Sequence, residues 1–194
     1  MKAVFFDIDT QIDFLFPAGS LYVPGAEQLL PAISRLNHYA AAQGIPVVSS
    51  MCAHAEDDPE FRQWPAHCVI GTVGQLKPAA TLLEKRALIG VSSGDYGIEG
   101  AQQILLEKSH LDITTSPNFR SLLTRLSAER NIVYGVVTEY CVRFAALALL
   151  ETGKPVSLVT DAIETLSAGE SAETFREFTG RGGKLITAAE VCAQ

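Results

Sequence analysis

The chain has 194 residues, of which 47% are hydrophobic, and a formal net charge of −7 at pH 7. This length suits one domain, residues 1–194, with a sizeable core. The acidic balance argues against nucleic-acid binding, and no apolar run is long enough to span a membrane. The first acidic residue, Asp7, comes too early in the sequence for the apolar stretch of a signal peptide. The four cysteines are not closely paired along the chain. We therefore expect a cytoplasmic protein with reduced thiols.

Strand-like and helical segments alternate along the chain. Short apolar runs predict strands at Lys2–Ile8, Ile45–Ser50, Ile104–Lys108, Asn131–Val137, Pro155–Thr160 and Lys184–Thr187, with a further candidate at Arg86–Ile89. Helical patterns lie at Ala26–Gln43, Asn118–Ala128, Val142–Glu151 and Ser171–Thr179. Alternation with short connections predicts an α/β fold: three αβα layers around a doubly wound, mainly parallel sheet of about six strands.

Charged residues stand at the ends of two predicted strands. Asp9 follows the first strand, and Lys108 ends the run that begins at Ile104. In a doubly wound sheet, ligands bind beyond the carboxyl ends of the strands, so both side chains are placed for chemistry. Asp7 lies two residues before Asp9, so the alternation of side chains along a strand predicts that both point to the same face of the sheet. Asp7 is expected to have a structural partner. The alternative for any single strand-end charge is a solvated loop residue.

Cys141 lies between the apolar run that ends at Val137 and a segment of good helix formers, residues 141–150. This position predicts a thiol on the first turn of a helix. There, free N–H groups and the helix dipole favour a thiolate and can receive an oxyanion. The alternative is a small buried hydrophobic residue, which most isolated cysteines are.

An acidic loop between Cys52 and His67 carries two of the four histidines, His54 and His67. Two imidazoles and a carboxylate are typical of an open zinc, iron or manganese site. The alternative is a solvated loop in which the histidines have no common role.

Four motifs, in this order along the chain, resemble those of the isochorismatase-like cysteine hydrolases and, within them, the nicotinamidase-related branch. The resemblance covers most of the chain, from Ala3 to the helix near Phe175. It is carried by Asp9-x-Gln11-x-Asp13-Phe14 with the Gly19–Gly25 segment, by Trp64-Pro65-x-His67-Cys68, by Lys108, and by Thr138-Glu139-x-Cys141-Val142-Arg143.

The resemblance implies a catalytic triad of Asp9, Lys108 and Cys141. Cys141 would attack an amide carbonyl as a thiolate, Asp9 would carry its proton to the leaving ammonia, and Lys108 would stabilise the charged pair. The oxyanion would bind the backbone N–H groups of Val137 and Cys141, and the Val136–Val137 peptide would be cis. Water would then hydrolyse the thioester.

The resemblance also implies a metal site at His54, Glu60 and His67. The family's aspartate is replaced here by Cys52, and a thiolate binds soft metals such as zinc better than a carboxylate does. The loss of a ligand is the other interpretation of this replacement. Phe14 and Trp64 match the positions that stack on the pyridine ring of nicotinamide.

We therefore expect a hydrolase of linear amide C–N bonds that converts nicotinamide to nicotinate with a divalent zinc, iron or manganese ion. A homo-oligomer, either a dimer or a tetramer, is expected. One alternative is a metal-independent amidohydrolase acting on N-carbamoyl or ureido compounds. Another is a metal-binding module without catalysis, against which the intact Asp9, Lys108 and Cys141 argue.

Overall fold

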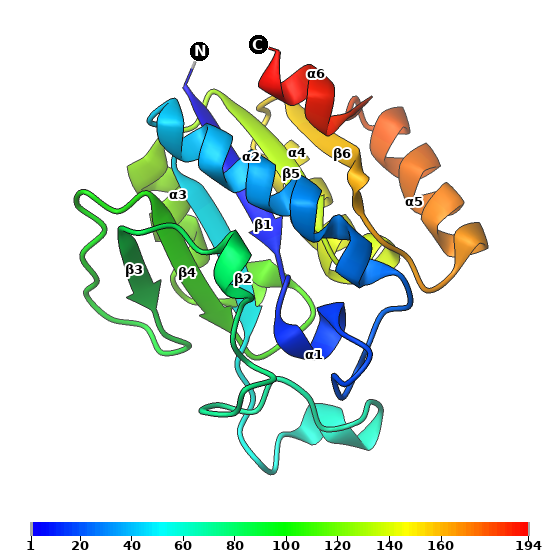
Figure 1. The fold of residues 1–194 in the computed structure, drawn as a ribbon. Helices are drawn as coiled ribbons and strands as arrows, with labels where there is room; N and C mark the ends of the chain where they lie inside the picture. The colour runs from blue at the N-terminus through cyan, green and yellow to red at the C-terminus, as the bar shows by residue number, and fades with distance from the viewer. Residues whose placement is uncertain (1, 194) are drawn as a thin grey trace.

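A single seven-stranded parallel sheet organises residues 2–193, which the computed structural model describes (Figure 1). The strand order is β3-β4-β2-β1-β5-β6-β7, and every pairing is parallel. The strands are β1 (Ala3–Ile8), β2 (Val47–Cys52), β3 (Arg86–Ile89), β4 (Gln103–Lys108), β5 (Arg130–Gly135), β6 (Val156–Ile163) and β7 (Lys184–Ile186). The predicted doubly wound α/β fold is confirmed.

The sheet has one strand more than the about six predicted, because the candidate at Arg86–Ile89 is the edge strand β3. This strand pairs only with β4, and two of its four residues are exposed. Leu88, for example, is 61% exposed. An edge strand with little buried surface gives a weak hydrophobic signal in the sequence.

Helices cover both faces of the sheet. They are α1 (Ile12–Leu15), α2 (Leu30–Ala42), α3 (Phe119–Leu126), α4 (Arg143–Leu150), α5 (Ala168–Gly180) and α6 (Ala188–Cys192). In Figure 1, α2 lies in front of the sheet near α6, and α3 and α4 lie behind it. The helix predicted from Ser171 begins at Ala168 instead, because the Ser167 side chain caps it by accepting a hydrogen bond from the Glu170 N–H. No helix within residues 2–193 is both long and apolar enough to cross a membrane.

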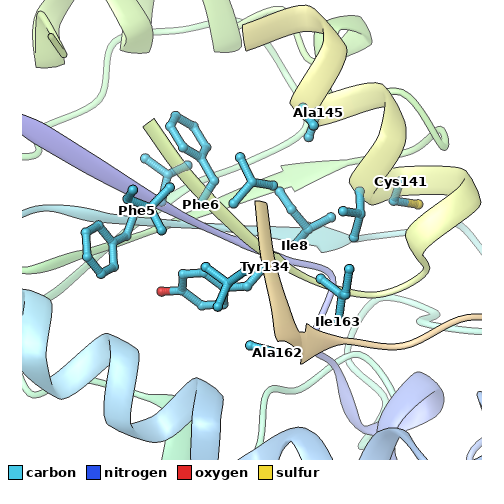
Figure 2. Packing of buried hydrophobic residues seen from close by; sticks show 14 of the residues in the cluster. Phe5, Phe6, Ile8, Tyr134, Cys141, Ala145, Ala162 and Ile163 are labelled. Atoms are coloured by element: carbon cyan, nitrogen blue, oxygen red, sulfur yellow. The ribbon is translucent and has the colours of Figure 1, made fainter. Parts of the chain in front are cut away.

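The core lies around β1, whose six residues are all buried. The Phe5 ring meets the Tyr134 ring of β5 edge to face, with centroids 6.2 Å apart. Figure 2 shows Ile8, Ala162 and Ile163 packed in the same cluster, with Cys141 at its margin. Burial on both faces explains why β1 appears in the sequence as a continuous apolar run.

The chain leaves β1 toward β2 on one side of the sheet and later continues from β5 to β7 on the other side. The order therefore reverses beside β1, and ligands bind at such a switch point, beyond the carboxyl ends of the strands. The long connection between β2 and β3 extends beyond this edge in Figure 1, together with α1. The predicted site residues all belong to this edge.

Candidate active site

Asp9 follows β1 in the left-handed region, with φ of 50°. Its carboxylate accepts a hydrogen bond from Ser50 Oγ at 2.6 Å, whereas Asp7 accepts one from Ser49 Oγ at 3.1 Å. Ser49 and Ser50 are successive residues of β2 and point to opposite faces of the sheet. Asp7 and Asp9 therefore also point to opposite faces. The prediction that they share a face is wrong, because the left-handed turn at Asp9 breaks the alternation. The structural partner expected for Asp7 is Lys77, at 2.9 Å.

The Asp9 carboxylate is fully buried and paired with Lys108. Lys108 Nζ, at the end of β4, lies 2.8 Å from Asp9 Oδ2, and neither side chain has exposed surface. Burial alone would raise the pKa of the Asp9 carboxyl, but the Lys108 charge and hydrogen bonds from Cys141, Lys108 and Ser50 hold the pKa below its usual value. Burial opposes the charge of Lys108, yet the Asp9 carboxylate raises the pKa of its ammonium well above the usual value. Asp9 is therefore an ionised proton acceptor beside a permanent cation.

Cys141 lies in a kinked segment, Thr138–Val142, that leads into α4 and in which the Tyr140 backbone is not helical, with φ of −116° and ψ of −107°. Its thiol sulfur is 3.8 Å from Lys108 Nζ. Burial raises the pKa of the Cys141 thiol well above its usual value, and the attraction of Lys108 does not offset this effect. Desolvation thus opposes the thiolate that the helix start is expected to favour, and that expectation stays a prediction. The thiol needs a proton acceptor, and Asp9 is in contact with it.

The backbone before Cys141 crosses closely over the end of β1. At Gly135, φ is 123° and an added Cβ would lie 2.1 Å from the Ile8 carbonyl oxygen, so only glycine fits. The Val136 N–H then donates to that oxygen at 2.9 Å, and the Val136–Val137 peptide is cis, as the resemblance implies. The Val137 N–H donates to no acceptor among the described residues 2–193. It therefore has the free donor that an oxyanion site requires.

Cys52, His54 and His67 form a compact group of metal-binding atoms, one from each side chain, all within 4.8 Å of one another. His54 Nδ1 contacts Asp58 Oδ2 at 3.0 Å, and His67 Nδ1 contacts the Pro65 carbonyl oxygen at 2.8 Å. Each imidazole is thus held through Nδ1, as metal-binding histidines usually are.

With Nδ1 engaged, Nε2 is the nitrogen that each imidazole can offer to a metal. His54 Nε2 is buried and has no hydrogen-bond partner among the described residues. A buried orphan nitrogen is costly unless a ligand uses it. Burial also lowers the pKa of His67, which leaves its ring neutral and able to bind a metal. The donor set of the site therefore fits a divalent ion.

Glu60 lies beside this group rather than within it. Its Oε1 is 3.9 Å from His67 Nε2, and it is not one of the three residues of the compact group. Cys52 has contacts on both sides: Lys108 Nζ donates to its sulfur at 3.2 Å, and the thiol donates to Asp9 Oδ2 at 3.7 Å. Burial raises the pKa of the Cys52 thiol to about 12, so a metal must displace its proton.

Cys141 lines a largely apolar pocket. The empty space in this pocket, including the part open to solvent, is about 550 Å³. Phe14 and Trp64, the predicted ring-stacking residues, both line it, as do Cys52, Glu60 and His67. The sequence analysis missed other lining residues: Leu21, Tyr22, Val23, Leu111, Val136, Tyr140 and Leu166. Tyr140 stacks edge to face on Trp64, with ring centroids 5.7 Å apart, and its position next to Cys141 was the one available signal.

Three further polar residues of the motifs hold the framework of the site. Gln11 Nε2 donates a hydrogen bond to the Cys52 carbonyl at 2.8 Å, and Gln11 Oε1 accepts one from the Cys52 N–H at 2.7 Å. Asp13 accepts the N–H groups of Ser20 and Cys68, at 2.9 and 2.7 Å. Glu139 accepts the N–H groups of residues 166 and 167, each at 2.9 Å.

The comparisons with known proteins agree with this arrangement. A family model described as the isochorismatase domain matches residues 97–190. The nicotinamidase/pyrazinamidase of Mycobacterium tuberculosis is 32% identical over 179 residues, which cover 86% of this chain and 87% of that protein. The chain belongs to the isochorismatase-like hydrolases, in their nicotinamidase-related branch.

Other members of this family are similar over nearly the whole chain. The Escherichia coli nicotinamidase is 26% identical over 206 residues, covering 94% of this chain and 93% of that protein. The structure of the Pyrococcus horikoshii pyrazinamidase in complex with zinc has a TM-score of 0.79 at 24% identity, covering 96% of this chain and 99% of that one. At this identity, the structural likeness shows the isochorismatase-like fold alone.

Proposed function

We propose that the protein is a cysteine-dependent amidohydrolase that converts nicotinamide to nicotinate and ammonia. One observation carries the proposal: a buried carboxylate and a buried cation meet a thiol whose residue, Cys141, lines an apolar pocket. Lys108 Nζ lies 2.8 Å from Asp9 and 3.8 Å from the Cys141 sulfur. A nucleophile beside an ionised base, with the base held by a third group, is the pattern of covalent acyl transfer.

In the proposed reaction, Asp9 takes the thiol proton of Cys141 as the sulfur attacks the amide carbon. The oxyanion that forms accepts hydrogen bonds from the N–H groups of Val137 and Cys141. When the C–N bond breaks, Asp9 returns the proton to the nitrogen and ammonia leaves. Water then cleaves the thioester with the help of Asp9, which releases the acid and restores the thiol.

Lys108 favours the ionised form of Asp9, so that the carboxylate is ready to accept a proton at the start of each step. The ammonium is buried with the carboxylate, so the pair is desolvated together and the attraction is strong. The base is therefore available at neutral pH even though it is shielded from water.

The choice of nicotinamide rests on the pocket and on the relatives. Phe14 and Trp64 line a space suited to a flat ring, and the proteins of E. coli and M. tuberculosis that this chain resembles are named for this substrate. We propose that Cys52, His54 and His67, with Glu60 alongside, hold a divalent ion. When bound, such an ion would supply a Lewis-acid contact for a ring nitrogen. Zinc, iron or manganese fits the donor set, and the sulfur favours the first two.

A metal-independent amidohydrolase of N-carbamoyl or ureido compounds is the second candidate. It is favoured by the protonated Cys52 thiol, which replaces a carboxylate ligand and already has partners in Lys108 and Asp9. A cytoplasmic location and a homo-oligomeric state remain predictions.

An ammonia-release assay with nicotinamide and benzamide separates the two candidates. Benzamide has the same shape but no ring nitrogen. Faster cleavage of nicotinamide supports the proposed function. Equal rates, or no cleavage of either compound, would contradict it and favour linear ureido or carbamoyl substrates.

A further inference from the structure

A second buried ion pair lies on the α2 face of the sheet, opposite to the Asp9 side chain. Lys77 Nζ is 2.9 Å from Asp7 Oδ2, and neither side chain has exposed surface. Asp7 also accepts hydrogen bonds from Thr10 Oγ1 at 2.7 Å, Asn37 Nδ2 at 3.1 Å and Ser49 Oγ at 3.1 Å. Buried charges persist only when they are paired and hydrogen-bonded in this way. The proposed chemistry uses neither Asp7 nor Lys77.

Lys77 also holds the residue that follows Asp9. Its ammonium donates to the Thr10 hydroxyl and, at 3.5 Å, to the Thr10 carbonyl oxygen. Lys77 thus joins the end of β1 to the loop that comes after the histidine cluster. Thr10 itself is fully buried, so water cannot replace these contacts.

The rest of this loop, residues 74–76, continues the attachment along the chain. The Ile12 N–H donates to the Leu76 carbonyl at 2.8 Å, and the Asp13 N–H donates to the Gly74 carbonyl at 3.1 Å. Between them, Gln11 Nε2 donates to the Gln75 carbonyl at 2.7 Å. The loop therefore binds residues 10–13 at successive positions, and the charged contact of Lys77 lies nearest to Asp9.

Asp9 needs such support because its backbone is in a region that residues other than glycine rarely adopt, with φ of 50°. Such a conformation persists only where the surroundings hold it. The same turn directs the Asp9 carboxylate to the face of Ser50 and Lys108 instead of the face of Asp7.

We propose that the buried Asp7–Lys77 pair is a positioning device: through Thr10, it holds the left-handed turn that places the Asp9 carboxylate against Lys108 and Cys141. Asp7 and Lys77 are then positioning residues for the amide hydrolysis, and the inference rests on the proposed function for its kinetic consequence alone. Its structural consequence, the placement of Asp9, does not depend on the substrate.

The test is the double variant Asp7→Asn/Lys77→Met. It removes both charges together, because a single replacement would leave an uncompensated buried charge and a misfolded protein. Asn at position 7 keeps an oxygen that can accept from Thr10. The matched control is Tyr134→Phe, which removes the 2.5 Å hydrogen bond from Tyr134 to Asn37 Oδ1 in the same network, farther from Asp9.

For the double variant, we expect kcat for nicotinamide to fall at least about tenfold, since small displacements of reacting groups have large effects. KM should stay within about twofold, because the pocket walls are untouched. A crystal structure should show Asp9 Oδ2 moved from its 2.8 Å contact with Lys108. Tyr134→Phe should lower the unfolding temperature while kcat and the Asp9 contact remain unchanged.

A double variant that keeps both kcat and the Asp9–Lys108 contact would overturn the inference. So would an equal loss of kcat in Tyr134→Phe, since the network would then act through general stability. If the unmodified protein cleaves no amide, the proposed function fails, but the crystal structure of the double variant still decides whether the pair positions Asp9.

Discussion

The Cys52 sulfur lies 3.2 Å from the ammonium of Lys108, closer than the 3.8 Å between that ammonium and Cys141. Cys52 therefore belongs to the histidine cluster and also contacts two residues of the predicted triad, Lys108 and Asp9. A change at Cys52 should alter both metal binding and the charge balance around Lys108.

The variant Cys52→Asp tests the first of these effects. A carboxylate is a harder ligand than a thiol, so the zinc content should fall relative to manganese when the protein is loaded from an equimolar mixture of the two metals. Nicotinamidase activity should be kept or raised, because the variant restores the ligand type that the resemblance implies. Elemental analysis of the dialysed protein gives the ratio of the metals. An unchanged ratio would mean that Cys52 is not a ligand.

Removal of a histidine tests the metal site itself. We expect His54→Ala to lose most of its bound divalent metal, because His54 Nε2 is a buried nitrogen without another partner. Elemental analysis measures this loss directly. The control is His38→Ala on α2, whose ring bonds its own helix at the Ser34 carbonyl and should not affect the metal content. Full activity in a metal-free protein would contradict the proposed metal site and favour the second candidate function.

Asp9→Asn should lower kcat at least about a hundredfold, the usual range for the loss of a general base. The amide has nearly the same shape but cannot accept the thiol proton. Steady-state kinetics with nicotinamide measure the effect, with Asp161→Asn on β6 as the control, because Asp161 does not line the pocket and instead accepts the Ala188 N–H. An unaffected rate would point to Asp7 or Asp13. The structure speaks against both, since Asp7 pairs with Lys77 and Asp13 holds two backbone N–H groups.

Ser50→Ala should lower kcat by about tenfold, because a hydrogen bond to a charged group is worth about 1.5–3 kcal/mol. Ser50 Oγ donates to Asp9 Oδ1 at 2.6 Å and helps to keep that carboxyl ionised. Kinetics of Ser50→Ala and of Ser50→Thr, which keeps the hydroxyl, provide the comparison. Equal losses in both variants would show that packing, and not the hydrogen bond, is what matters at this position.

The sequence predicted the fold well because the central strands are buried on both faces and their apolar runs are unbroken. It also predicted which residues lie at the carboxyl edge, since the position of Asp9, Lys108 and Cys141 follows from the alternation of strands and helices. Local patterns could not show the left-handed turn at Asp9, and the predicted face of Asp7 was therefore wrong.

Contacts between segments far apart in the chain could not be predicted from the sequence patterns either. Nothing in a single sequence indicates that Lys77 reaches Asp7 across 70 residues, or that Leu111 and Leu166 line one pocket with Phe14. The desolvation of the Cys141 thiol could not be predicted either. The helix start is a local feature, whereas the burial that raises the pKa of the thiol comes from the whole pocket.

The most direct test of the account is the turnover of nicotinamide by Cys141→Ala. The thiol is the proposed nucleophile, so the rate should drop to no more than about a thousandth of the unmodified protein's rate. The fold and the metal content should stay unchanged, and Cys192→Ala, at the end of α6, should keep full activity. Retention of even a few per cent of turnover by purified Cys141→Ala would contradict the account and place the chemistry on another residue.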